Sequence, residues 1–326
     1  MARSFVTALL LCAGLASAAI GPARAQGFPQ REPIKIVVPF PPGGPTDSVA
    51  RIISQGLQSA LGQSIVIENR GGAGGEVGGK FVASAPANGY TLLMTPAGAL
   101  TTGPAVNPDF GYDPEKVFTP VCELIETPVV ISVLPTLPVK SLADAVAYAK
   151  ANPGKLVWGS QGFGTAPHLL AEMFKLEAGI NMLHVPYRGS SPLLNAALAK
   201  QVQILADPTT TSLPYIKAGN LRPIAIAGAV RAQTLPNVPT VVEAGFPKLQ
   251  APFWLAVVAP AGTPGDVVDK LNHAFRQVLA VPDTLAKLRS LDTFAKAGTP
   301  AELGAMLARE RAQWKAIVQT AHIEMK

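Results

Sequence analysis

Hydrophobic and polar positions along the chain alternate between short apolar runs and longer runs in which apolar residues recur every three or four positions. The run 34–38 is typical of a buried strand, and Val49, Ile53 and Leu57 after it have the spacing of one helix face. Strands are predicted at 34–38, 64–68, 90–94, 129–134, 156–159, 183–186, 202–206, 221–227 and 253–258. Helices are predicted at 46–61, 76–85, 141–150, 166–177, 192–200, 209–218, 264–279 and 300–321.

This alternation of strands and helices predicts an α/β protein with mostly parallel sheets and helices on both faces. The length of the chain suggests two such lobes. We expect residues 26–126 and 251–326 to form the first lobe and residues 127–250 the second, with crossovers near Glu126 and Gln250. Loops at the carboxyl ends of the strands would face a crevice between the lobes, where α/β folds place ligands.

The loop after the first predicted strand has the composition of an anion-binding turn. It contains Pro42, Gly43 and Gly44, and Thr46 or Asp47 is expected to cap the helix that follows. The two glycines have no Cβ, so a ligand can approach the backbone closely, and amides at a helix start favour anions. An ordinary strand-to-helix turn is the alternative interpretation.

Two further loops before predicted helices, 162–165 and 207–211, share this character because they are rich in glycine or threonine. Backbone donors and hydroxyl groups suit a small carboxylate. If each lobe contributed one helix N-terminus, the two carboxylates of a dicarboxylate could each bind at one of them. An exposed helix N-terminus would stabilise a bound carboxylate by roughly 0.3–1 kcal/mol.

The first residues have the pattern of a secretory signal peptide. Arg3 precedes an apolar run from Phe5 to Leu15, and Ala23-Arg24-Ala25 fits the small-residue cleavage pattern. Cleavage after Ala25 removes residues 1–25 and leaves 326 − 25 = 301 residues, with Cys122 as their one cysteine. An exported chain that cannot form an internal disulfide suits a bacterial periplasm.

Charge and hydropathy exclude other classes of protein. The formal net charge of +6 falls to +4 when Arg3 and Arg24 are removed, a weak positive balance that is compatible with anionic ligands. No basic run with interleaved aromatic residues occurs, so nucleic acid is not an expected partner. After Leu15 no apolar run approaches the length that spans a membrane.

The sequence lacks the common motifs of catalysis and metal binding. Its four histidines, His168, His184, His273 and His322, have no partner at ligand spacing, and packed or surface histidines are the simpler interpretation. No G-x-S-x-G, G-x-G-x-x-G or G-K-[ST] motif occurs. Cys122 lies in an apolar run and is interpreted as a packed thiol. We therefore expect no catalytic residue, no metal and no cofactor.

Several segments, taken in order, resemble the solute-binding proteins of tripartite tricarboxylate transporters, the Bordetella uptake gene family. They are VPFPPGGPTD at 38–47, NGYTLL at 88–93, NPGK at 152–155 with GSQGFGT at 159–165, HVPYRG at 184–189, LPNVPT at 235–240 and APAGTP at 259–264. The resemblance runs from the predicted signal peptide to the last predicted helix.

This resemblance implies a type II periplasmic binding protein of the Venus-flytrap kind, acting as a monomer. Such proteins bind a small carboxylate or similar metabolite between their lobes and deliver it to a membrane permease of one large and one small subunit. The ligand loops of the family map onto Phe40, Pro42, Gly43, Gly44, Thr46, Thr95, Ser160, Gly162, Gly164, Thr165 and Asp207. There Asp207 would accept a hydrogen bond from a ligand hydroxyl, an ammonium group or a bridging water; capping of the next helix is its alternative role.

Two other functions remain open at this stage. An extracytoplasmic sensor subunit would use the same lobes but present the closed form to a signalling partner, and a neighbouring pair of permease genes would separate it from a transport receptor. An enzyme is the third interpretation, which the lack of a nucleophile–base pair or metal site weakens.

Overall fold

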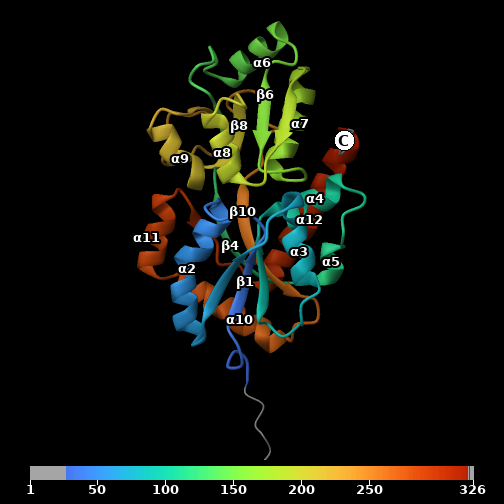
Figure 1. Ribbon diagram of the computed structural model, residues 1–326, viewed down its shortest axis with the longest axis vertical. Coiled ribbons are helices and arrows are strands. Elements are labelled where there is room, and N and C mark those ends of the chain that lie inside the picture. Colours follow the sequence, from blue (N-terminus) through green and yellow to red (C-terminus); the bar gives the residue numbers. More distant parts are fainter. Residues whose placement is uncertain (1–26, 322, 324–326) are drawn as a thin grey trace, which may run out of the picture.

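The computed structural model describes residues 27–321 and 323, so the predicted signal peptide lies outside the described residues. Two β-sheets flanked by helices form two lobes, one above the other in Figure 1. We call the six-stranded sheet with its helices the first lobe, and the five-stranded sheet with its helices the second lobe. The two-lobed α/β fold predicted from the sequence is confirmed, while the lobe boundaries at 126/127 and 250/251 stay predictions.

The sheet of the first lobe has the order β11-β4-β10-β3-β1-β2. Its strands are β1 (Ile34–Val38), β2 (Ile65–Asn69), β3 (Thr91–Thr95), β4 (Phe118–Thr127), β10 (Phe253–Pro260) and β11 (Phe294–Ala295). In β1, Ile36 lies opposite Ile67 of β2 and Leu92 of β3, in parallel register.

The sheet of the second lobe has the order β7-β6-β8-β5-β9. Its strands are β5 (Val129–Val133), β6 (Val157–Ser160), β7 (Leu183–Pro186), β8 (Ile204–Pro208) and β9 (Arg222–Ile226). The chain passes from β4 in the first sheet to β5 in the second across Pro128, and it returns to the first sheet at β10.

Helices follow most of these strands and flank both sheets. In the first lobe they are α2 (Pro45–Leu61), the 3₁₀ turn η1 (Ala73–Gly75), α3 (Glu76–Ala83), the 3₁₀ turn η2 (Ala97–Ala99), α4 (Thr102–Val106), α5 (Pro114–Val117), α10 (Gly265–Leu279), α11 (Pro282–Ser290) and α12 (Pro300–Thr320). In the second lobe they are α6 (Leu142–Ala151), α7 (Ala166–Ala178), α8 (Ser190–Leu198) and α9 (Thr209–Lys217).

The central strands are buried on both faces, which explains why they read as continuous apolar runs. In β1, Ile34 and Ile36 belong to one apolar cluster, which includes Ile53 of α2. Val37 belongs to a second cluster, with Val82 of α3 and Leu303 of α12. The two clusters lie on opposite faces because successive side chains of a strand point to opposite sides.

The prediction of mostly parallel sheets is wrong in detail, because both sheets are mixed. Strands β1, β2 and β3 run parallel, but β10 pairs antiparallel with β3 and with β4. In the second lobe β5 pairs antiparallel with β8 and with β9. The antiparallel strands β5 and β10 each come directly after a passage of the chain from one lobe to the other. The direction in which the chain enters a sheet depends on this path, and the periodicity of a strand does not record it.

Three local predictions also need correction. Helix α2 begins at Pro45 with Gly44 as its N-cap and no side-chain cap, so neither Thr46 nor Asp47 caps it. Strand β4 was not predicted, because Pro120, Glu123 and Glu126 interrupt its apolar pattern. Helix α11 was not predicted either, because this short helix has only two buried residues and so lacks a clear apolar face. The helix predicted at 141–150 is confirmed as α6, and its N-cap Ser141 accepts a hydrogen bond from the Asp144 amide.

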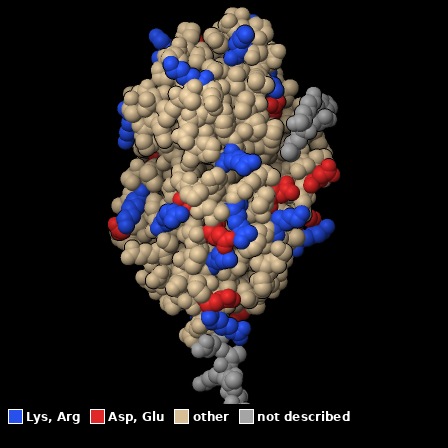
Figure 2. Space-filling view, in the orientation of Figure 1, with Lys and Arg blue, Asp and Glu red and all other residues tan. Residues whose placement is uncertain are grey.

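Basic and acidic side chains lie interspersed on the face shown in Figure 2, without a broad basic patch on that face. Among residues 27–321, no helix combines the length and the apolar character needed to cross a membrane.

Candidate ligand-binding site

Two small cavities lie where the loops of the two lobes meet. The first, of about 10 Å³, is lined by Phe40, Pro41, Gly44, Pro45, Thr46, Pro96, Gln161, Ser190, Ser191 and Phe253. The second, of about 20 Å³, is lined by Pro96, Ala97, Gly98, Val129, Gln161, Thr165, Ala166, Pro167, Pro252, Phe253 and Trp254. A single water molecule needs about 10–15 Å³, so the loops of the two lobes are in contact here. Hydrogen bonds from Thr102 to the Gly164 carbonyl and from Ser191 to the Pro42 carbonyl also join the lobes, and we call this arrangement the closed form.

Three helices begin at the walls of these cavities. Helix α2 of the first lobe begins at Pro45, and helices α7 and α8 of the second lobe begin at Ala166 and Ser190. The first amides of a helix have no partner within the helix and favour a negative charge. None of the described residues that line the two cavities is a lysine, an arginine, an aspartate or a glutamate. An anion bound here would therefore meet amide and hydroxyl donors from both lobes.

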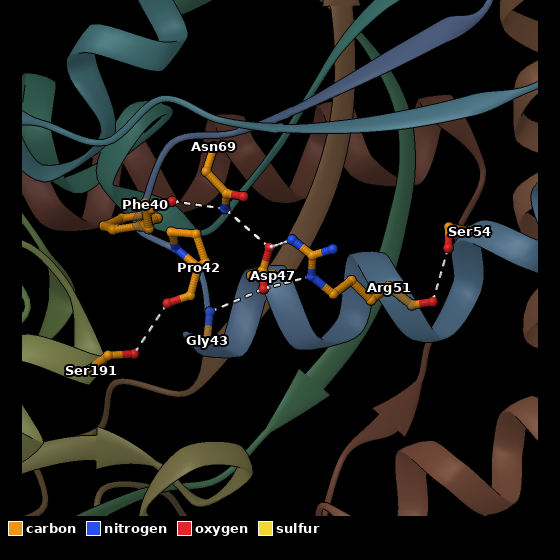
Figure 3. A network of polar contacts seen from close by, with 8 residues as sticks. All are labelled: Phe40, Pro42, Gly43, Asp47, Arg51, Ser54, Asn69 and Ser191. Atoms are coloured by element: carbon orange, nitrogen blue, oxygen red, sulfur yellow. Dashed lines mark hydrogen bonds and ion pairs between the residues drawn. The ribbon is translucent and has the colours of Figure 1, made fainter.

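The loop at the start of α2 is held by the buried carboxylate of Asp47 (Figure 3). Its Oδ2 accepts a hydrogen bond of 3.0 Å from the Gly43 amide, and Arg51 donates to both carboxylate oxygens. Asn69 donates to Asp47 Oδ1 at 3.1 Å and to the Phe40 carbonyl at 3.0 Å. Gly43 has a φ of +81°, which a glycine adopts without strain. Asp47, in the first turn of α2, thus holds the preceding loop in place through hydrogen bonds, although it is not the N-cap of the helix.

The ionised form of Asp47 is the stable one in this site. Burial by itself would raise the pKa of Asp47, but hydrogen bonds from Arg51, the Gly43 amide and Asn69 outweigh burial and hold this pKa below its ordinary value. Because the folded-state pKa is lowered, the stabilisation is present above the ordinary aspartate pKa. It is lost as pH falls through the lowered folded-state value.

Asp47→Ala is expected to lower the free energy of unfolding by about 2 kcal/mol at pH 7, since the Gly43 amide and Asn69 lose a charged acceptor. Urea unfolding at pH 7 and again at pH 3 measures this. The difference from wild type should shrink at pH 3, below the ordinary aspartate pKa, because the unfolded chain binds a proton there more readily than the folded protein does. Ser54→Ala, on the same helix, is the control, because its hydroxyl bonds only to the Arg51 carbonyl. Equal effects of the two substitutions would contradict the role given to Asp47.

Asp207 lies at the other side of the first cavity, behind the residues that form its wall. Its side chain is fully buried and accepts hydrogen bonds from Gln161 Nε2 (2.7 Å), Ser190 Oγ (2.6 Å) and Thr211 Oγ1 (2.5 Å). Burial raises the pKa of Asp207 to about 6, against the opposing effect of these three donors. Asp207 itself belongs to β8, and the N-cap of α9 is Pro208, so it does not occupy the cap position.

The loop 160–165 of the second lobe folds on its own polar groups. Thr165 Oγ1 donates to the Gly162 carbonyl at 2.7 Å, and the Gly162 amide donates to Ser160 Oγ at 3.2 Å. Gly162 and Gly164 have φ values of +136° and +71°, in the region that favours glycine. Since both hydroxyls are engaged within the loop, its shape depends on them.

Two histidines that belong to different predicted elements, a helix and a strand, lie next to each other behind this loop. The rings of His168 and His184 lie 4.5 Å apart, and ligand atoms of these two residues and of Glu172 lie within 4.8 Å of one another. The Gly164 amide donates to His168 Nδ1, so a neutral His168 ring carries its proton on Nε2. With one nitrogen accepting a bond and the other protonated, His168 offers no free lone pair, and this arrangement does not suit a metal ion.

The structure places the predicted site residues in three groups. Phe40, Gly44, Thr46 and Thr165 line the two cavities. Pro42 and Gly43 complete the first loop, and Gly43 lines a separate groove with Ser191. The remaining five do not line the two cavities and are fully or partly buried behind their walls: Thr95, Ser160, Gly162, Gly164 and Asp207.

Most residues of the cavity walls are absent from the set predicted from the sequence, and among them are Gln161, Ser190, Phe253 and Trp254. Gln161 lies inside a predicted loop and was available as a candidate. Ser190 directly follows the HVPYRG segment, at a helix start. Phe253 and Trp254 lie at the start of β10, and only the passage between the lobes brings them to the cleft.

Comparisons with known proteins bear on the family and the fold of this chain. Residues 49–323 match the family described as the tripartite tricarboxylate transporter family receptor. The solved structure of the periplasmic binding protein BugD is 34% identical, with a TM-score of 0.86 over 91% of this chain and 99% of that chain. Rpa4515 of R. palustris, solved with adipate, is 37% identical, with a TM-score of 0.87 over 91% and 99%. MatC (Rpa3494) of Rhodopseudomonas palustris, solved with bound malate, is 32% identical, with a TM-score of 0.85 over 89% and 99%.

Proposed function

Since the chain belongs to the tripartite tricarboxylate transporter family of receptors, which are solute-binding proteins and not enzymes, we propose that it captures a small carboxylate between its lobes. The protein then delivers this carboxylate, unchanged, to a membrane permease. The observation that carries the proposal is the convergence of three helix N-termini, from both lobes, on cavities whose described lining has no charged side chain. Structures of relatives with adipate and with malate support the ligand class.

In this proposal, the two lobes close over the ligand when it binds. In the closed form Thr102 Oγ1 of the first lobe donates to the Gly164 carbonyl of the second at 2.6 Å. Ser191 Oγ of the second lobe donates to the Pro42 carbonyl of the first at 3.4 Å (Figure 3). A ligand favours this form only if it contacts both lobes better when they are closed, and the three helix N-termini meet that demand.

The remaining parts of the proposal rest on the signal-peptide pattern of residues 1–25 and on the family. The mature protein begins at Gln26, acts as a monomer in the periplasm, and has a permease of one large and one small subunit as its partner. The alternative function is a sensor subunit that presents its closed form to a signalling protein. Co-purification of the liganded protein with a permease subunit favours transport, whereas co-purification with a signalling protein favours the sensor.

Calorimetry with a matched pair of ligands tests the carboxylate class. We expect adipate or malate to bind with a Kd in the micromolar range or tighter, and the uncharged diamide adipamide to bind at least roughly 100-fold more weakly, because it lacks the charge that helix N-termini stabilise. Mass spectrometry of small molecules released from the denatured, purified protein provides the independent readout. Equal affinity for the diacid and the diamide, or release of a cationic metabolite, would contradict the proposal.

A further inference from the structure

His168 has a defined contact with the ligand loop of the second lobe. It lies in the first turn of α7, is 2% exposed, and its Nδ1 is 3.2 Å from the Gly164 amide nitrogen. A backbone N–H can only donate, so Nδ1 must accept and the neutral ring carries its proton on Nε2. Among the described residues, the imidazole is therefore the acceptor that satisfies this amide.

Gly164 is held from both lobes. While its amide bonds to His168, its carbonyl accepts the 2.6 Å bond from Thr102 of the first lobe. A Cβ at Gly164 would lie 3.0 Å from the Gly103 Cα, so this residue passes close to the backbone of the first lobe. A small rotation of Gly164 would break the bond to Thr102, and the position of Gly164 therefore matters for closure.

The ring of His168 is itself fixed by its neighbours. The Phe163 ring packs edge-on at 5.3 Å, and the His184 ring lies 4.5 Å away. Burial lowers the pKa of His168 to about 4 against the effect of Glu172, while Lys175 adds to the lowering. At neutral pH the ring is uncharged, with its acceptor available to the loop.

We propose that His168 is a positioning residue for ligand binding, which holds Gly164 in the orientation that closes on Thr102 of the first lobe. The inference rests on the proposed function, because it assigns His168 a part in closure over the ligand. It assigns His168 no contact with the ligand.

Two variants separate the acceptor from the bulk of the ring. In His168→Asn the side-chain Oδ1 takes the place of Nδ1 as acceptor, whereas His168→Leu fills part of the space without an acceptor. His273→Leu, on the exposed side of α10 in the first lobe, is the control. The amide exchange rate of Gly164, measured by NMR without ligand, reports the bond itself. Calorimetry with adipate and malate reports binding, and thermal unfolding reports the fold.

We expect His168→Leu to raise the exchange rate of the Gly164 amide at least roughly tenfold and to weaken binding roughly tenfold, the effect of one hydrogen bond. His168→Asn should restore both to within about threefold of wild type. Unchanged exchange in His168→Leu overturns the proposal, and so does raised exchange with unchanged affinity. If wild type binds neither adipate nor malate, the proposed ligand class is at fault, while the exchange rates of the two variants still decide whether His168 holds Gly164.

Discussion

Gly74→Ala is expected to weaken ligand binding roughly 100-fold, equivalent to about 3 kcal/mol, while both lobes remain folded. A Cβ at Gly74, in η1 of the first lobe, would lie 2.2 Å from the Phe163 carbonyl oxygen of the second lobe. Side chains do not approach a backbone atom so closely, so the lobes must separate there. An open protein contacts its ligand with one lobe only, and the affinity that closure supplies is lost.

The residues around Gly74 leave little room for a backbone shift that would relieve this clash. A Cβ at Gly98 would lie 2.2 Å from the Gly74 carbonyl oxygen, and one at Gly103 would lie 2.3 Å from the Gly98 carbonyl oxygen. Three backbone segments of the first lobe are therefore stacked through glycines beneath the loop of the second lobe. Such packed interfaces resist small adjustments.

Gly62→Ala is the matched control for Gly74→Ala. Both glycines belong to the first lobe and have a φ of +63°, but a Cβ at Gly62 would meet nothing within 4 Å. Both variants carry the same backbone strain, and only one obstructs closure. Calorimetry with adipate or malate and the radius of gyration from small-angle scattering measure the difference. Wild-type affinity in Gly74→Ala would show that this contact does not limit closure.

Asp207→Ala is expected to lower the free energy of unfolding by about 3 kcal/mol and to weaken ligand binding roughly 100-fold. The substitution removes the common acceptor of Gln161, Ser190 and Thr211 in a fully buried site. Gln161 and Ser190 line the first cavity, so their reorientation changes the binding surface directly. Urea unfolding and calorimetry measure the two effects, and a normal affinity would show that the cavity wall does not depend on Asp207.

The pH dependence of stability gives a second test of Asp207. Its pKa in the folded protein is raised to about 6, so the folded state binds a proton more readily than the unfolded state does. The part of the stability that depends on protonation of Asp207 is therefore fully present below the ordinary aspartate pKa and lost as pH rises through about 6, while the hydrogen bonds from Gln161, Ser190 and Thr211 contribute separately.

Comparison with Asp207→Asn isolates this contribution, because the amide keeps the size of the side chain and does not titrate. Between pH 5 and pH 7, wild type should lose on the order of 1 kcal/mol of stability relative to Asp207→Asn. A constant difference between the two proteins over this interval would show that the carboxyl of Asp207 does not titrate there.

The sequence by itself determined most elements of the protein. The predicted strand at 34–38 and the helix that ends at Leu61 are confirmed, because a strand buried on both faces and an amphipathic helix leave strong local periodicities. The sequence also predicted an anion-binding turn at 42–46 from the glycines before a helix start; the structure confirms the turn and the helix start, and anion binding there stays a prediction. The α/β class followed from the order of these elements, and the expectation of two lobes followed from the length of the chain.

The tertiary structure alone decided how the two lobes meet. The antiparallel course of β5 and β10 depends on the path of the chain between lobes, and no local pattern records that path. Gln161 and Asp207, which are 46 positions apart, share a hydrogen bond only because β6 and β8 are neighbours in one sheet. His168 and His184 likewise became a pair through packing. Contacts of this kind depend on distances between segments, whereas periodicity describes one segment at a time. The sequence could therefore name candidate loops for a binding site, but it could not predict which side chains form the cavity walls.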